Sequence, residues 1–178
     1  MIKKSWILYF IGKIHHILKI RNASLSDRPR LIEIENLCFS KEEASTPKTT
    51  KQRLQHIRDS FFVAEEDVTI LGLVNGPVTG QEFITDDLFE NITENPSFGG
   101  QQTILGLGVH PDFQSRGILA KLLAHLEKEA CKRTRETVTL TCKEALISFY
   151  GKYGYINMGV ADSAHSGVVW YNMSKRLK

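Results

Sequence analysis

Residues 109–119 read Val109-His110-Pro111-Asp112-Phe113-Gln114-Ser115-Arg116-Gly117-Ile118-Leu119. An apolar strand pattern precedes this stretch, and an amphipathic helix is expected to begin within it. The first N–H groups of a helix have no partner inside the helix, and the helix dipole adds positive charge at the same end. The stretch therefore predicts an anion site, where Gly117 lets a phosphate approach and Gln114 and Arg116 add donors. An ordinary strand-to-helix connection accounts for the spacing equally well.

Hydrophobic periodicity predicts the elements around this stretch. Leu122, Leu123 and Leu126 recur at helical spacing and predict a helix over 116–133. A first helix should have Pro29 in its first turn and end near Cys38. Further helices are expected at 50–60, 86–89 and 145–153, and strands at 19–21, 61–64, 69–74, 103–109, 138–142, 155–160 and 168–173. This order predicts an α/β chain (α+β mixed), with helices on the faces of a mixed sheet.

Length and composition favour one ordinary globular domain of 178 residues. The net charge of +3, from 23 basic and 20 acidic residues, is too balanced to favour a nucleic-acid partner. The cysteines are three and widely spaced, which argues against a disulfide framework or a metal site and favours a reducing cytoplasm. Whether the protein forms a homodimer stays open.

The N-terminal segment 1–18 is set apart from the expected domain, 19–178. Its apolar run Trp6–Ile11 has six residues, too few for a transmembrane segment, and no small-residue cleavage site follows. One interpretation is a helix that binds a membrane surface or a partner. The other is an accessory helix or an extension outside the domain.

Two motifs carry a resemblance to a known family. Val109-x-Pro111-x-x-Gln114-x-x-Gly117-x-Leu119 resembles the coenzyme A signature of the GNAT superfamily of N-acetyltransferases, and departs from it at Leu119, where the family has Gly or Ala. Residues 140–155, with the Phe149-Tyr150 pair before Gly154-Tyr155, are similar to the second half of the family. The closest similarity is to its arylalkylamine N-acetyltransferase branch.

The resemblance implies a GNAT-like fold. Its central sheet has six to seven strands, is mixed and mostly antiparallel, and is flanked by helices. A V-shaped opening lies between the fourth and fifth strands, here 105–109 and 138–142. Acetyl-CoA is the co-substrate that this opening would hold, and the family's chemistry needs no metal.

The resemblance also assigns coenzyme-binding residues. The pantetheine arm would pair with the backbone of Leu107 and Val109, and a bulge at Gly106 and Gly108 would leave amides free. The Val109 amide would stabilise the oxyanion of the tetrahedral intermediate. The full set of expected cofactor-binding residues is Leu107, Gly108, Val109, Gln114, Ser115, Arg116, Gly117, Ile118, Leu119, Cys142, Ser148 and Tyr150.

Catalytic roles follow from the same resemblance. Tyr150 matches the family's general acid, and a phenol of pKa ~10 can protonate a thiolate whose conjugate acid has a pKa of ~8.5–10. The two histidines that serve as base in some relatives are replaced here by Thr103 and Leu105. Glu43 is the preferred candidate base, followed by Glu42. Simple solvation of both carboxylates, or a proton relay through water, are the alternatives.

Other candidates for acceptor contacts are weaker. His165 lies between the last two strands and either touches the acceptor or sits in a surface loop. Glu33 and Glu35 on the first helix either contact an amine or form ion pairs. The long irregular segment 78–99 is either functional or a tolerated insertion, and it would crowd the acceptor groove.

The predicted function is N-acetylation of a small primary amine, such as an arylalkylamine or a polyamine, by direct attack on acetyl-CoA. The alternatives are acetylation of a protein N-terminus or lysine, and a coenzyme A-binding module without catalysis.

Overall fold

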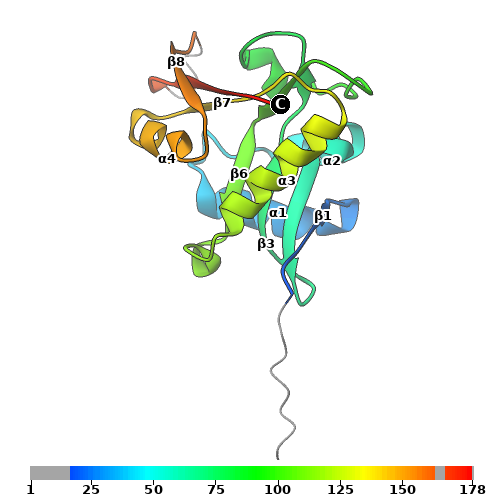
Figure 1. Cartoon of the computed structure of the whole chain (residues 1–178). Helices are drawn as coiled ribbons and strands as arrows, with labels where there is room; N and C mark the ends of the chain where they lie inside the picture. Colours follow the sequence, from blue (N-terminus) through cyan, green and yellow to red (C-terminus); the bar gives the residue numbers. More distant parts are fainter. Residues whose placement is uncertain (1–16, 163–166, 178) are drawn as a thin grey trace, which may run out of the picture.

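The computed structural model describes residues 17–162 and 167–177. Within this part of the chain, the strands form two sheets (Figure 1). The first sheet has the order β1 (Lys19–Asn22), β2 (Phe61–Glu66), β3 (Thr69–Asn75), β6 (Gly106–Val109). The second has the order β4 (Val78–Thr79), β5 (Gln101–Ile104), β7 (Thr137–Cys142), β9 (Tyr171–Arg176), β8 (Ile156–Val160). The helices are α1 (Arg28–Cys38), α2 (Pro47–His56), α3 (Ile118–Lys132) and α4 (Ile147–Gly151).

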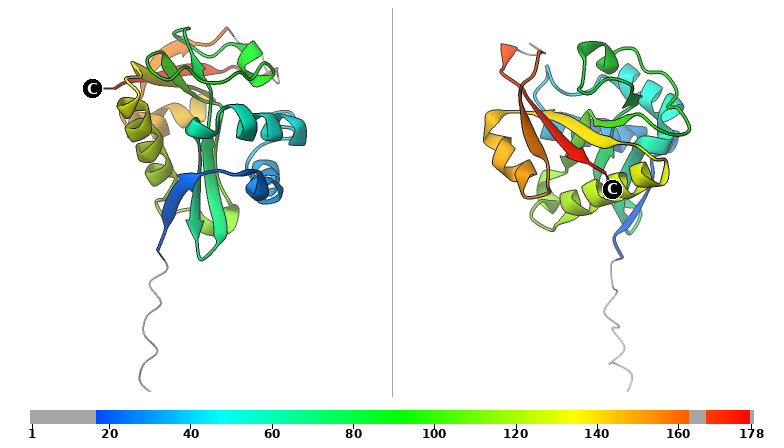
Figure 2. Two further views of the ribbon diagram at one scale, coloured as in Figure 1. Left: turned by 90° about the vertical axis from the view of Figure 1, so that its right-hand side faces the viewer. Right: turned by 45° about the horizontal axis from the view of Figure 1, so that its top comes forward.

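The first sheet is covered on both faces. Figure 2 shows α3 on one side of it and α1 and α2 on the other. Alternate residues of β2 serve the two faces: Phe62 belongs to the core beneath α3, and Phe61 to the core beneath α1. The buried leucines of α3 include Leu122 and Leu126, and burial of each contributes about 1.5–3 kcal/mol. Both faces of this sheet are therefore closed by apolar packing.

The strands expected at 61–64 and 69–74 form a hairpin, whose turn lies at Asp67 and Val68. Asp67 and Val68 have φ of 47° and 62°. Two successive residues with positive φ are the signature of a type I′ turn, whose twist matches that of the flanking strands. The turn points Val68 into solvent, where it is 93% exposed.

The strand expected over 103–109 is present in two pieces that belong to different sheets. β5 pairs in parallel with β7, from Gln102–Val138 to Ile104–Leu140. β6 pairs instead with β3. The two pieces part at Leu105, whose amide donates to the Asn75 carbonyl at 2.9 Å. Beyond this point β6 and β7 diverge, which creates the expected V-shaped opening.

The last strand lies later in the chain than the sequence pattern predicts. The apolar residues at 168–173 suggested a strand there, but β9 covers Tyr171–Arg176. Its position is set by the partner strand, because Cys142 pairs with Tyr171 and Thr137 with Arg176. Val169 precedes the strand and is 58% exposed. Tertiary pairing thus overrode the local pattern.

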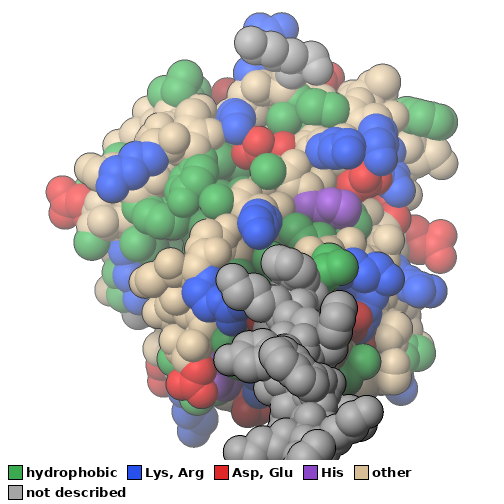
Figure 3. Space-filling view, turned by 60° about the horizontal axis from the view of Figure 1, so that its bottom comes forward, with side chains coloured by type: hydrophobic (Ala, Val, Ile, Leu, Met, Phe, Trp, Pro, Cys, Tyr) green, Lys and Arg blue, Asp and Glu red, His purple; other side chains and the backbone are tan. Residues whose placement is uncertain are grey.

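The surface charges, the helix lengths and the arrangement of possible metal ligands bear on which partners the protein can bind. Basic and acidic side chains are intermixed on the face that Figure 3 shows. In residues 17–162 and 167–177, no helix has the length and apolar character needed to cross a bilayer. Within the same ranges, no group of three or more His, Cys, Asp or Glu side chains is arranged to hold a metal ion. The apolar run at 6–11 lies outside the described residues.

Candidate active site

The turn that leads into α3 has the backbone geometry of an anion site. Ser115 and Gly117 have φ of 61° and 73°, and Gly117 is the N-cap of α3. A Cβ at Gly117 would meet no heavy atom within 4 Å, so the space beside the helix N-terminus is open. The Gln114 side chain folds back, and its Nε2 donates to the Val109 carbonyl at 3.1 Å. Gln114 therefore shapes the turn itself.

The outer edge of β6 faces the opening. The His110 amide donates to the Leu71 carbonyl of β3 at 2.8 Å. Because hydrogen-bonded pairs alternate along an antiparallel ladder, the amides of Leu107 and Val109 point away from β3. The Val109 carbonyl also accepts from the Cys38 thiol at 3.3 Å. An extended ligand could thus pair with β6 as an added strand.

A cleft of about 670 Å³ runs between this edge and β7. The structure brings ten of the twelve expected cofactor residues to its lining: Leu107, Gly108, Val109, Gln114, Ser115, Gly117, Ile118, Leu119, Cys142 and Tyr150. Ser148 and Arg116 are not among the lining residues. Arg116 instead forms an ion pair with Glu66, with Nη2 and Oε1 2.9 Å apart. That contact joins residues distant in sequence, so the motif alone gave no sign of it.

A smaller cavity of about 100 Å³ adjoins the cleft. The two share a border formed by Phe39, Glu43, Leu107, Thr141, Tyr150 and Trp170. The remaining walls of the small cavity are formed by apolar residues: Ile84, Phe89, Ile104, Leu105 and Leu140. Glu43 is the only acidic residue in this described lining. Glu42 is exposed and outside it.

Tyr150 stands at the border of the two cavities. Burial, together with the neighbouring Cys142, raises the pKa of its hydroxyl to about 12. Burial also raises the pKa of the Cys142 thiol to about 11. Tyr150 is packed edge-on against Phe149, with the ring centroids 5.2 Å apart. Its hydroxyl is thus a neutral proton donor over the physiological range.

Glu43 is held by a cation. Its Oε1 lies 2.5 Å from Nζ of Lys143, the residue that follows β7. The same ammonium lies 5.6 Å from the centre of the Trp170 ring. Motif matching did not single out Lys143 or Trp170. They converge only because the end of β7, the start of β9 and the loop after α1 meet at the opening.

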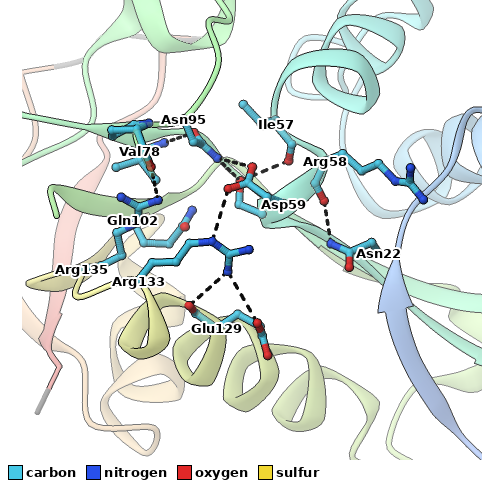
Figure 4. A network of polar contacts seen from close by, with 12 residues as sticks. Asn22, Ile57, Arg58, Asp59, Val78, Asn95, Gln102, Glu129, Arg133 and Arg135 are labelled. Carbon is cyan, nitrogen blue, oxygen red and sulfur yellow. Dashed lines mark hydrogen bonds and ion pairs between the residues drawn. The ribbon is translucent and has the colours of Figure 1, made fainter. Parts of the chain in front are cut away.

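The segment between β4 and β5 forms one wall of the small cavity. It contributes Ile84 and Phe89. Figure 4 shows how its far end is anchored: Nδ2 of Asn95 donates to Asp59 Oδ1 at 2.8 Å, and its Oδ1 accepts from the Val78 amide at 2.7 Å. Arg135 adds a hydrogen bond from Nη2 to the Pro96 carbonyl at 2.6 Å. The sequence signals for this segment were its length and the helix expected at 86–89, which is present as a 3-10 helix at Asp86–Phe89.

The other acidic candidates lie elsewhere. Glu33 pairs with Arg30 at 2.7 Å and is exposed. Glu35 is 3% exposed, and burial raises its pKa. It sits beside Gly106, where an added Cβ would lie 3.1 Å from its Oε1. His165 lies outside the described residues.

Comparison with known proteins agrees with this geometry. A family model described as "Acetyltransferase (GNAT) domain" matches residues 92–177. An uncharacterized N-acetyltransferase, ycf52, of Porphyra purpurea is 26% identical over 167 residues, which cover 92% of this chain and 86% of the relative. An acetyltransferase of Pectobacterium atrosepticum is 32% identical over 108 residues, or 59% of this chain and 63% of the relative. This chain thus spans less than two thirds of that bacterial relative.

The fold has well-matched solved counterparts. Arabidopsis thaliana Naa50, in complex with the bisubstrate analogue CoA-Ac-MVNAL, superposes with a TM-score of 0.68 at 16% identity. The match covers 89% of this chain and 97% of the Arabidopsis chain. The expected GNAT fold is therefore confirmed, with mixed sheets flanked by four helices.

Proposed function

We propose that this chain is a GNAT acetyltransferase that uses acetyl-CoA and, from that premise, that it acetylates a small primary amine bearing an aromatic or other apolar group. The observation that carries the proposal is the pair of joined cavities. The larger opens on the N-terminus of α3, and the smaller is apolar with a carboxylate at its border. The premise rests on the family match, while the choice of acceptor is our inference.

The coenzyme would lie along the larger cleft. Its pyrophosphate would meet the free amides at the start of α3, where Gly117 leaves room. Its pantetheine arm would run along the outer edge of β6 and pair with Leu107 and Val109. This course brings the thioester to the border between the cavities, beside Tyr150.

Catalysis would then need a base for the acceptor nitrogen and an acid for the leaving thiolate. Glu43 would accept a proton from the acceptor ammonium, and the free amine would attack the thioester carbonyl. The Val109 amide would donate to the developing oxyanion. As the C–S bond breaks, Tyr150 would protonate the leaving thiolate. Its raised pKa keeps that proton in place until then.

The acceptor would occupy the smaller cavity. Phe39, Phe89 and Trp170 offer aromatic surface, and Glu43 offers the charge that an ammonium needs. A volume of about 100 Å³ suits a small side group and excludes a folded surface. These features support an arylalkylamine or a similar amine over a polyamine, which would place further charges against apolar walls.

A protein N-terminus is the second candidate. The Arabidopsis structure, which holds an analogue that joins coenzyme A to an acetylated peptide, has a closely similar fold. A peptide would need a path out of the small cavity past Ile84 and Phe89. That wall is the observation that places this candidate second.

The test is release of free coenzyme A thiol from acetyl-CoA in the presence of a panel of acceptors. The panel contains arylalkylamines, alkylamines, polyamines and short peptides with free N-termini. We expect the highest kcat/KM with arylalkylamines. A preference for peptides would select the second candidate. Tight acetyl-CoA binding without turnover on any acceptor would instead mark the chain as a coenzyme-binding module.

A further inference from the structure

Lys143 presents a primary amine inside the cleft. It follows β7 directly and lines the same cleft as Leu107, Val109 and Tyr150. Its Nζ lies 2.5 Å from Glu43 Oε1. The side chain is 44% exposed, whereas that of Glu43 is 13% exposed. An ammonium is thus already bound by the carboxylate that the proposed mechanism uses as base.

The surroundings of this ammonium match those expected for an acceptor. Trp170 lies beneath it at 5.6 Å from the ring centre, and Trp170 borders both cavities. An aromatic face and a carboxylate together make a cation site. In the structure that site holds the protein's own lysine.

We propose that Lys143 is a self-acetylation site, at which the protein modifies itself when no acceptor amine is bound. The proposal rests on the proposed function. Glu43 takes a proton from the Lys143 ammonium, and the neutral Nζ attacks the thioester carbonyl of acetyl-CoA. The new N–C bond forms first and gives a tetrahedral intermediate. The C–S bond then breaks, and the thiolate takes a proton from Tyr150. The nitrogen loses its second proton as the amide forms, and that proton restores Tyr150. The products are Nε-acetyl-lysine and free coenzyme A, with no change of oxidation state.

Self-acetylation would change the acceptor site. Acetylation removes the positive charge of Lys143, so the ion pair with Glu43 is lost. Glu43 is then free to receive an acceptor ammonium. A bound acceptor should in turn protect Lys143, because both amines need the same carboxylate.

The experiment incubates the purified full chain with radiolabelled acetyl-CoA and no amine, and maps the labelled lysines by mass spectrometry over time. Lys152, an exposed lysine close to α4, reports spontaneous acetylation. We expect Lys143 to be labelled at least ~10-fold faster than Lys152, because it lines the cleft in which we propose that the thioester binds. Gly117→Glu, which should block coenzyme binding, and Glu43→Gln should both bring Lys143 down to the background rate. Lys143→Arg should remove the label, and Lys152→Arg should leave labelling of Lys143 unchanged.

Three results would overturn the proposal. Labelling of Lys143 no faster than Lys152, in a preparation that turns over amines, would refute self-acetylation and leave the proposed function standing. Rapid labelling that persists in Gly117→Glu and Glu43→Gln would show plain chemical reactivity. No label and no turnover with any acceptor would remove the proposed function together with this inference.

Discussion

Tyr150 combines burial with a position between two cavities. Burial raises the pKa of its hydroxyl to about 12, so it keeps its proton at neutral pH. A proton donor must also reach the leaving group, and the shared border of the cleft and the small cavity supplies that position. The placement of Tyr150 thus supports the role that the motif predicts, whereas its raised pKa makes proton transfer to a thiolate less favourable. The role itself stays a prediction.

The substitution Tyr150→Phe tests the role of Tyr150 as general acid. The substitution removes one hydroxyl and keeps the ring packing against Phe149. We expect kcat to fall about 100-fold or more, with the Kd of coenzyme A unchanged. Tyr153→Phe is the control, since Tyr153 lines the same cleft but not the small cavity. Equal kcat for Tyr150→Phe and the wild type would remove Tyr150 from the mechanism.

Gly117 allows a second test at the scale of one residue. Gly117→Glu places a carboxylate at the N-terminus of α3, where we propose that the pyrophosphate binds, and should weaken acetyl-CoA binding at least ~10-fold by calorimetry. Gly99→Glu is a matched control, because Gly99 has the same φ of 73° and equally open space. Both variants carry the same backbone strain of ~1–2 kcal/mol. Equal binding by the two variants would place the pyrophosphate elsewhere.

At the scale of elements, one ion cluster ties β1 to the start of α1. Arg21 Nη1 donates to Asp27 Oδ2 at 2.7 Å, and the Ser24 amide donates to the same oxygen at 2.7 Å. Burial pushes the pKa of Asp27 upward, but the bonds from Arg21 and Ser24 outweigh it and lower the pKa overall. A carboxyl with a lowered pKa stabilises the fold above its unfolded-state pKa. That stability is lost as the pH falls through the folded-state pKa.

Asp27→Ala should therefore destabilise the protein by about 1–3 kcal/mol at about pH 7, measured by urea unfolding. The difference from the wild type should shrink as the pH falls through the lowered folded-state pKa of Asp27, because the wild-type carboxyl is then protonated as well. Asp87→Ala, at an exposed position, is the control and should have little effect. A deficit that is constant with pH would mean that Asp27 acts through packing.

At the scale of the whole molecule, the segment between β4 and β5 joins two distant regions. One end is anchored by the hydrogen bond of Asn95 to Asp59 (Figure 4) and by that of Arg135 to the Pro96 carbonyl. Its middle supplies Ile84 and Phe89 to the smaller cavity, the proposed acceptor site. A wall built from a long loop depends on such anchors, because few of its own backbone groups are paired. The anchor should therefore affect acceptor binding without touching the acceptor.

Asn95→Ala removes three hydrogen bonds of one side chain, to Asp59, Ser60 and Val78. We expect the acceptor KM to rise ~3- to 10-fold, since each lost bond contributes about 1 kcal/mol. The Kd of acetyl-CoA should not change. Asn91→Ala, on an exposed part of the same segment, should behave as the wild type. A rise in both the acceptor KM and the Kd of acetyl-CoA would show that the substitution causes a general loss of stability.

Features that depend on neighbours along the chain could be predicted from the sequence. The helix over 118–132, with Gly117 before it, follows from local periodicity. The turn at Asp67 and Val68 does not, because a β-branched residue disfavours the positive φ that Val68 adopts. The residues expected at the coenzyme end came from the motif resemblance, and the structure brings ten of these twelve to one cleft. Their binding of the coenzyme stays a prediction. Only Arg116 and Ser148 fall outside the cleft lining among its twelve expected members.

The smaller cavity, the proposed acceptor site, depends instead on tertiary contacts. Phe39, Phe89 and Trp170 come from three separate segments, and the parting of the sheets at Leu105 makes them walls of one cavity. The same packing brings Glu43, but not Glu42, to the lining of this cavity and pairs Glu43 with Lys143. Contacts of this kind carry no periodic signal, because each residue's role depends on partners far away in the sequence.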